Sequence, residues 1–441
     1  MTSGGSPSRL AAPAASGGAV LALLLGIAPS LSGQLPSASA ADLALGGQSV
    51  ATARGFAAVA SNPAGLAMPG TPASTLAALP LRVGSGIDPV TLFDVGEYDG
   101  RRIPHAVREA WLRSIEAEGE ESGAAEARLT WVAASRGSLG VQISTSAVGH
   151  ARLNPDAAEL LLFGNAGRTG EPRAFILQGS SFDAFVLSTA AFAAAIPLDL
   201  AIGDAPDQAF AVGATLKLTV GNVLYMGRDV GTALSDDPLR VALRFPVIQT
   251  DTAGGRYENG TGVSMDLGFQ WEAEGGRWGA GLAIRNLFDT FAWDLDALYY
   301  RAGTALFDQD RSDTDFVARP VREAPPALLE PVRDFGFGRA LVLGVVHRPR
   351  EGLDVTGELR ARGGSGLEME PRFQVGAGVE LRTASGVPLR GHAAVVAGGV
   401  RLGGGATVPL GGLLLSGGFS WLTGSRDDAG MAMIALSFGG S

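Results

Sequence analysis

Two stretches near the end of the chain, LDVTGELRAR at 353–362 and FQVGAGVELR at 373–382, share one alternating pattern. Apolar or small residues occupy every second position, and polar or small residues occupy the positions between them. Successive side chains of a strand point to opposite faces, so the pattern predicts strands with one apolar and one polar face. Each stretch has about the length that a tilted strand needs to cross a bilayer.

The same alternation recurs earlier, at 210–219, 263–272 and 278–285, where bulky apolar residues collect on one face and glycine or charged residues on the other. Residues 241–247 show a shorter version of it, and we interpret them as one more strand. A membrane β-barrel needs this distribution, because its outer band faces lipid while its interior is wet or plugged. A large secreted β-sandwich or a soluble barrel would also alternate, with the apolar faces buried in a protein core.

The lengths of the connections favour the membrane barrel. Counted from Leu76, long connections follow odd strands, at 85–125, 151–181, 222–239 and 304–337. Short connections follow even strands, at 136–138, 349–352, 383–387 and 409–411. Bacterial barrels have short periplasmic turns and longer external loops. The brief link at 273–276 is an exception to this rule. We predict an all-β protein, a transmembrane antiparallel β-barrel, in which we count about 16 candidate strands.

The composition excludes several classes of protein. The chain of 441 residues has no cysteine, so disulfides and thiolate metal sites are excluded. Its net charge of −10 and its lack of a basic block make nucleic acid a poor partner. The 64 glycines follow no collagen-like period, and small residues inside a barrel and in its turns would account for them.

The N-terminus has the pattern of an export signal. An apolar run at 19–27 is followed by Ala38-Ser39-Ala40, which fits an A-x-A cleavage site. We therefore expect a cleaved signal peptide at 1–40, and the strand pattern predicts an outer-membrane barrel at 73–441. The apolar run is too short for a membrane helix.

A short glycine-bearing segment at 46–50 leads into a helix-like stretch and then Asn62-Pro63-Ala64-Gly65, just before the first strand. Asn-Pro initiates turns, because proline disfavours helix at the preceding residue. This arrangement resembles the outer-membrane long-chain fatty-acid transporter superfamily, which also includes the outer-membrane component of type IX secretion. The phrase Asn286-Leu287-Phe288 resembles a recurrent phrase of the same superfamily.

The resemblance implies a barrel of about 14 strands (14–16) with an N-terminal plug segment. Residues 41–72 would be this hatch or plug, with Asn62, Pro63 and Ala64 in it. The resemblance also implies passive uptake of a hydrophobic small molecule. Its implied partners are outer-membrane lipids, a hydrophobic ligand and the outer-membrane assembly machinery, which reads an aromatic residue near the end of the last strand, here Phe438. A second hypothesis is a barrel that serves protein secretion or surface attachment, with a partner at the long loops. A third is an outer-membrane hydrolase.

Charged residues on the polar faces of the predicted strands are the candidate lumen residues. They are Lys217, Asp266, Glu272, Arg285, Asp354, Glu358, Arg360, Glu380, Arg382 and Arg390. Mixed signs on neighbouring strands favour paired charges that hold a plug or brace the wall, whereas a ring of one sign would indicate ion selectivity.

Catalytic, metal and cofactor signals are weak. The four histidines are far apart in sequence, and no HExxH, GxSxG, Walker or dinucleotide motif occurs in the required context. The acidic stretch at 308–315 lacks the glycine and glutamate of a calcium loop. A serine such as Ser416 or Ser420 near His392 could form a hydrolytic pair in space. We predict a non-enzymatic protein without cofactor or metal.

Overall fold

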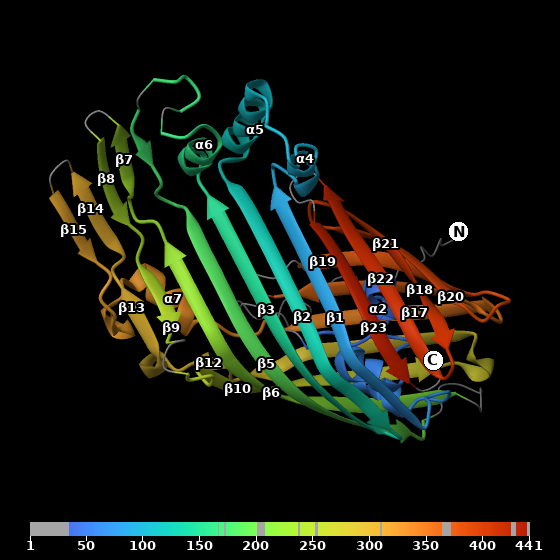
Figure 1. The fold of residues 1–441 in the computed structure, drawn as a ribbon. Coiled ribbons are helices and arrows are strands. Elements are labelled where there is room, and N and C mark those ends of the chain that lie inside the picture. The colour runs from blue at the N-terminus through green and yellow to red at the C-terminus, as the bar shows by residue number, and fades with distance from the viewer. Residues whose placement is uncertain are drawn as a thin grey trace, which may run out of the picture.

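The computed structural model describes residues 35–165, 167–171, 173–200, 208–236, 239–251, 255–308, 311–363, 372–424 and 429–438. In this part of the chain, 14 strands form one closed antiparallel barrel (Figure 1). They are β1 (Ser74–Asp88), β2 (Glu121–Arg136), β3 (Leu139–Leu153), β5 (Ser181–Leu198), β6 (Ala209–Arg228), β10 (Gly260–Glu272), β11 (Trp278–Asp289), β17 (Ala340–Arg350), β18 (Leu353–Arg362), β19 (Phe373–Arg382), β20 (Pro388–Val396), β21 (Gly399–Leu410), β22 (Leu413–Gly424) and β23 (Ala429–Phe438). Each strand pairs with the next in this order, and β23 pairs with β1 to close the ring.

The apolar face of the strands points outward, as the alternation predicts. On β6, Leu216 and Leu218 are each 51% exposed, while Thr215 and Lys217 between them are buried. No core covers these outer faces in the described residues, so the soluble sandwich is excluded. A closed barrel leaves no unpaired strand edge, which is the condition for strands to lie in hydrocarbon.

Aromatic side chains stand on this outer face toward both ends of the wall. Trp131 and Trp278 are exposed near the end that carries the short turns, and Phe182 is exposed near the other end. Aromatic girdles at both interfaces are typical of outer-membrane barrels. Among the described residues, no helix has the length and apolarity that crossing a membrane would need.

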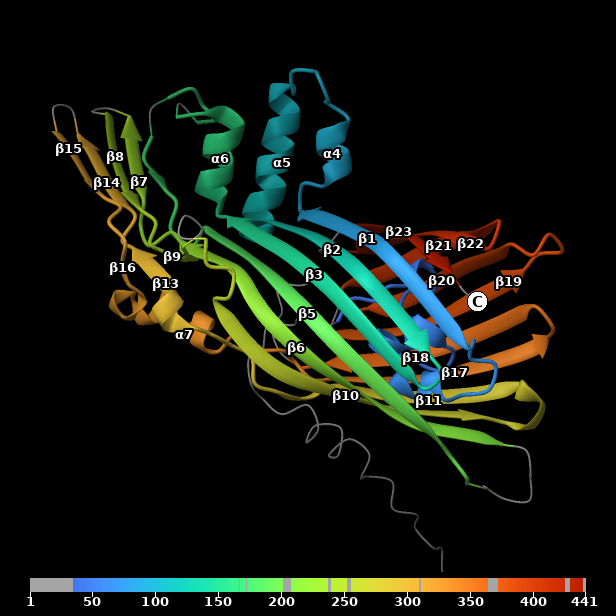
Figure 2. The same cartoon turned by 60° about the horizontal axis from the view of Figure 1, so that its bottom comes forward.

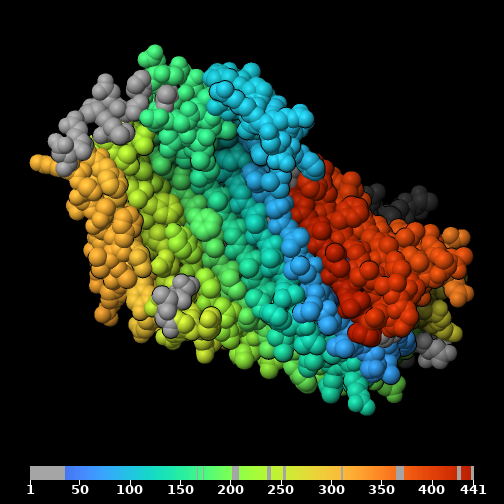
Figure 3. Space-filling model, in the orientation of Figure 1, coloured from blue at the N-terminus to red at the C-terminus, as the bar shows by residue number. Residues whose placement is uncertain are grey.

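The two ends of the barrel differ (Figures 1 and 3). One end has tight turns, and by the rule of short periplasmic turns it is the periplasmic end. The external end carries α4 (Leu92–Gly96), α5 (His105–Glu118) and α6 (Pro155–Phe163), which project beyond the wall of β1–β3. α4 and α5 lie within the predicted long connection at 85–125, and α6 lies within the one at 151–181.

A second sheet of five strands also lies at the external end, in the order β15 (Arg311–Asp315), β14 (Thr304–Asp308), β8 (Leu239–Arg244), β7 (Ala233–Asp236), β4 (Phe175–Ile176). The interpretation of residues 241–247 as a membrane strand is therefore wrong. Six residues of alternating pattern suit any half-buried sheet, and β8 pairs with β7 and β14 instead of the wall. Without this extra strand, the short turn at 273–276, which contains η3 (Glu274–Gly276), falls at the periplasmic end and is no exception.

The long connection between β11 and β17 is more structured than the predicted polar loop at 304–337. It contains β12 (Ala292–Trp293), η4 (Leu295–Ala297), β13 (Leu298–Arg301), β16 (Arg319–Pro320), η5 (Val321–Glu323) and α7 (Pro326–Arg333), besides β14 and β15. The four-residue strand β9 (Val247–Thr250) pairs with both β6 and β13.

Residues 35–73, here called the N-terminal segment, run inside the barrel before the chain joins β1 (Figure 2). The segment contains α2 (Ala40–Ala44), η1 (Gly55–Ala57), α3 (Ala58–Ser61) and η2 (Pro63–Leu66). Most of its residues are buried, including Ala38 and Ala40 of the predicted cleavage site. Residues 1–34 of the predicted signal peptide and the tail at 439–441 lie outside the described residues.

Candidate functional site: the lumen of the barrel

The Asn62-Pro63-Ala64 motif makes a turn that is bonded both to its own segment and to the wall. The side-chain oxygen of Asn62 accepts a hydrogen bond from the Ala64 amide at 3.2 Å, which caps η2. Its side-chain nitrogen donates to the Val50 carbonyl at 2.8 Å and to the Phe269 carbonyl of β10 at 3.0 Å. Asn62 is fully buried. One amide therefore joins two stretches of the segment to a strand.

Glycines on the inner wall make room for the segment's backbone. Gly213 and Gly268 face each other on β6 and β10, directly under the Asn62-Pro63 turn. A Cβ on Gly213 would lie 2.5 Å from the Pro63 carbonyl carbon, well inside van der Waals contact. Two more pairs of facing glycines make room in the same way. Gly281 and Gly344 lie under Val50, and Gly405 and Gly418 lie under α2. The inner wall therefore has three shallow places that fit the segment.

Wall side chains also satisfy the segment's backbone. The Gln374 amide donates to the Gly46 carbonyl at 2.9 Å, and the Gln270 amide donates to the Val50 carbonyl at 2.9 Å. Thr215 donates to the Val59 carbonyl at 2.9 Å. The segment spends much of its length in irregular structure, so its carbonyls need such partners when buried. These three residues lie on predicted polar faces of the strands. They were not among the candidate lumen residues, because only charged residues were chosen.

Two predicted charges, Glu358 and Arg360 of β18, contact the segment as well. Glu358 accepts from the Val50 amide at 3.1 Å, and Arg360 donates to the Gly47 carbonyl at 3.0 Å. The two side chains also form an ion pair at 3.0 Å. Arg285 of β11 donates to the Ser61 carbonyl at 3.4 Å.

The predicted pair Lys217 and Asp266 joins β6 to β10. The Lys217 Nζ lies 2.5 Å from an Asp266 carboxylate oxygen and also donates to the side-chain oxygen of Asn286. Asn286 sits at a bulge of β11 with φ +50°, a left-handed conformation that asparagine tolerates better than most residues. Asn286, the first residue of the phrase that resembles the superfamily, therefore completes a buried polar cluster with Lys217 and Asp266.

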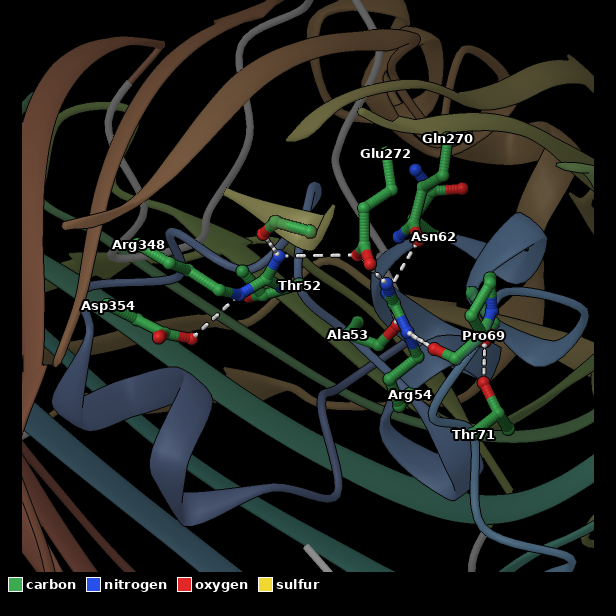
Figure 4. Close-up of polar contacts among 12 residues, drawn as sticks. Thr52, Ala53, Arg54, Asn62, Pro69, Thr71, Gln270, Glu272, Arg348 and Asp354 are labelled. Carbon is green, nitrogen blue, oxygen red and sulfur yellow. Dashed lines mark hydrogen bonds and ion pairs between the residues drawn. The ribbon is translucent and has the colours of Figure 1, made fainter. Parts of the chain in front are cut away.

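The remaining predicted charges lie toward the periplasmic end, beside a cavity of about 720 Å³. Figure 4 shows two of them, Glu272 and Asp354, with their partners. There Arg348 pairs with Glu272 at 3.3 Å and with Asp354 at 3.5 Å. Arg54 of the segment also reaches Glu272, at 3.3 Å, and donates to Gln270 at 2.6 Å. Burial lowers the pKa of Arg54 to about 10, so its guanidinium keeps its charge at neutral pH. Arg54 and Arg348 were absent from the predicted set.

A second group lines the same cavity across the lumen. Glu380 pairs with Arg390 at 2.7 Å and with Arg382 at 3.4 Å. All ten predicted charges thus lie on the inner face or its periplasmic margin, and nine of them belong to ion pairs of opposite sign.

The external half of the lumen is apolar. Val148, Phe185 and Leu224 point inward from β3, β5 and β6 and pack against residues of the long connection. We call this buried set the upper apolar cluster; it consists of Val148, Phe185, Leu187, Leu224, Met226, Ile248, Phe291, Trp293, Leu298, Tyr300, Val321, Ala324, Leu328, Leu329, Val332, Phe335 and Phe337. At its centre, the ring of Phe335 has its centroid 5.4–5.5 Å from those of Phe185, Phe291 and Trp293.

Two side chains of the β11 bulge region hold Phe335 and Phe337 in this cluster. Asn286 donates to the Gly338 carbonyl at 3.0 Å, and Asp289 accepts from the Phe337 amide at 2.6 Å. The sequence analysis missed Phe335 and Phe337 because it treated residues 304–337 as one connection. These two residues follow a short helix and do not belong to an alternating strand.

His392 and Ser420 are in contact, as the hydrolase hypothesis requires. The His392 Nε2 lies 3.3 Å from the Ser420 hydroxyl, while its Nδ1 lies 2.9 Å from the Ala44 carbonyl. Ser420 is 1% exposed, and α2 covers the pair. Ser416 instead bonds Thr407 at 2.9 Å. Among the described residues, which include most of the acidic stretch at 308–315, no group of three or more potential metal ligands occurs.

The same architecture occurs in solved structures. The toluene transporter TbuX of Ralstonia pickettii matches with a TM-score of 0.51 and 14% identity, covering 91% of this chain and 98% of that chain. The toluene transporter TodX of Pseudomonas putida matches with a TM-score of 0.50 and 12% identity, covering 93% and 99%. This chain has their barrel fold. The predicted resemblance is confirmed at the level of the fold. No protein-family model and no curated protein sequence matches the chain.

Proposed function

We propose that this outer-membrane barrel mediates passive uptake of hydrophobic small molecules. The observation that carries the proposal is the upper apolar cluster, which lines the external half of the lumen with aromatic side chains. Apolar molecules gain free energy on leaving water for such a lining. The fold shared with two transporters named for toluene supports the same direction.

The N-terminal segment acts in this proposal as the plug, and the Asn62-Pro63-Ala64 turn is its anchor. The plug blocks water and ions at the level where the paired glycines and glutamines hold it. The ten charges brace the wall and the plug. Export by a cleaved signal peptide and insertion by the outer-membrane assembly machinery complete the proposal.

The test is uptake of a radiolabelled hydrophobic compound by bacterial cells that lack their own transporters for such compounds. We expect cells that produce the chain to take up toluene faster than cells with an empty vector, and a hydrophilic sugar at an unchanged rate. Equal rates for toluene in both strains would contradict the proposal.

The His392–Ser420 contact gives little support to a hydrolase. An ester would have to reach a serine that α2 covers, and the Ala44 carbonyl stands where a triad has a carboxylate. Ester hydrolysis by the purified protein that disappears in the S420A variant would overturn this view.

The secretion alternative rests on the external sheet of β4, β7, β8, β14 and β15, which offers a surface for a protein partner. Its outer strand β15 is largely charged, and charge on an edge strand discourages pairing with another chain. Co-purification with a secretion complex that is lost on removal of residues 304–315 would favour this alternative.

A further inference from the structure

Trp293 of β12 carries a polar group into the upper apolar cluster. Its side chain is 4% exposed, and its Nε1 atom is buried and donates no hydrogen bond to any described residue. Two tryptophans of the wall are more exposed, yet both have partners. The Trp131 Nε1 donates to the Thr145 hydroxyl at 3.0 Å, and the Trp271 Nε1 donates to the Gln208 side-chain oxygen at 2.8 Å. The N–H of Trp293 therefore differs from the usual buried indole, which finds a partner.

The packing of the indole places this N–H on the side away from the wall. A Cβ on Gly221 of β6 would lie 2.5 Å from Cζ3 and 2.8 Å from Cη2, so the benzene side of the indole rests on this glycine. Gly260 of β10 approaches Cε3 of the same side, at 3.2 Å. Nε1 belongs to the other ring. The rings of Phe291 and Phe335 pack edge to face against the indole, both with centroids 5.5 Å away. The donor therefore lies among aromatic side chains.

A buried donor without an acceptor costs free energy, because the indole N–H has lost its hydrogen bonds to water. The cluster itself supplies little to replace them. Apart from the Tyr300 hydroxyl, the side chains of the upper apolar cluster carry no oxygen. A hydrocarbon that entered the cluster would leave the N–H unpaired. An apolar molecule with one acceptor oxygen would pair it and would still fill the aromatic surroundings.

We propose that Trp293 is a specificity-determining residue, which favours apolar molecules that carry one acceptor oxygen, such as aryl ketones, over hydrocarbons of the same shape. This inference rests on the proposed function, because it takes the upper apolar cluster as the place of the ligand. A neutral hydrogen bond contributes modestly to affinity, so the preference should be about three- to tenfold. Hydrocarbons remain ligands, but they leave a buried donor of the site unpaired, which is a general source of discrimination.

The experiment compares acetophenone with isopropenylbenzene, which has nearly the same planar shape and carries a methylene group in place of the carbonyl oxygen. Both are titrated calorimetrically into the detergent-solubilised full chain. The readout is the ratio of the two affinities, because partitioning into detergent is the same for every variant. We expect W293F, which keeps an aromatic ring without the N–H, to lower this ratio about three- to tenfold. The matched control W271F removes an N–H that already has a partner and should keep the ratio within about twofold.

A second measurement does not require that W293F folds. In a chain with isotope-labelled tryptophan, the indole N–H resonance of Trp293 should move downfield with acetophenone and not with isopropenylbenzene. Single substitutions of the other tryptophans assign this resonance. The same affinity ratio in W293F as in the unsubstituted chain, or a resonance that responds alike to both compounds, would overturn the role of Trp293 and leave the proposed apolar site standing. Binding of neither compound would overturn both the role of Trp293 and the upper apolar cluster as the ligand's place.

Discussion

The lumen is filled in two different ways at its two ends. At the periplasmic half, the N-terminal segment is held by backbone hydrogen bonds to wall side chains such as Gln270 and Gln374, and by contact with paired glycines. At the external half, the filling consists of packed aromatic and aliphatic side chains around Phe335. A hydrophobic molecule cannot replace the hydrogen bonds of the periplasmic half, so displacing those groups costs free energy. An apolar cluster can exchange its contacts for those of an apolar ligand. The external filling is thus suited to admit a ligand and the periplasmic one to exclude water.

Removal of residues 41–69, which leaves the predicted cleavage site in place, should have the largest effect on the two fillings of the lumen. The lower lumen would lose its filling, and we expect single-channel conductance in planar bilayers to rise at least about tenfold over the full chain, since wide lumens without a plug conduct. Deletion of residues 304–315, which belong to the external sheet, is the matched control and should leave conductance low. A conductance that stays low without the segment would mean that the upper apolar cluster seals the barrel by itself.

The F335A variant tests the apolar half. Truncation of a buried phenylalanine leaves a cavity and should lower the free energy of unfolding by about 3–5 kcal/mol. The cavity should also accept a small aromatic molecule, so toluene should raise the melting temperature of F335A more than that of the unsubstituted chain. F307A, which truncates a half-exposed ring of the external sheet, serves as the comparison. Equal toluene stabilisation in F335A and F307A would argue against the cluster as the ligand's place.

The N62A variant tests the polar half. It removes the hydrogen bonds that Asn62 donates to the Val50 and Phe269 carbonyls, while Gln270 still donates to Val50. Each lost bond should cost about 0.5–1.5 kcal/mol. We expect faster hydrogen exchange at residues 50–66, with unchanged exchange in the wall strands. N222A, at the external end of β6, removes a more exposed amide and should not change the segment. Uniformly faster exchange throughout the barrel would show that Asn62 stabilises the whole fold and not the segment.

The smallest effects are expected at Glu380, whose two arginine partners differ in exposure. The Arg382 side chain is 56% exposed, and that of Arg390 is 5% exposed. R382Q should change the free energy of unfolding by at most about 0.5 kcal/mol, the range of exposed ion pairs. R390Q should cost more, because it also removes a hydrogen bond to Thr407. The two variants should be compared by denaturant unfolding in the same detergent, and a larger loss in R382Q would contradict the geometry.

The alternation of residues predicted most of the wall, although at 241–247 it marked a strand of the external sheet instead. The alternating patterns at 353–362 and 373–382 show which side chains face lipid, because each side chain of a barrel strand points either to the lipid or to the lumen. The contacts of the lumen were harder to predict. Val50 meets Glu358 across 308 positions of the chain, and no local pattern records such a meeting. Charge identified Glu358 and Lys217 as lumen residues, but neutral Gln142 and Gln270, which bond the segment equally well, carry no comparable signal.

Closure of the ring by β1 and β23 sets an order for assembly. The first and last strands of the wall are neighbours, so the circle is completed only after the C-terminal strand has been delivered. Residues 35–73 precede β1 directly and end up enclosed. A finished ring offers this segment no passage through its wall, so the segment enters either before the seam closes or through an open end of the barrel. Because the segment continues directly into β1, its place in the lumen is tied to the strand at which the ring closes.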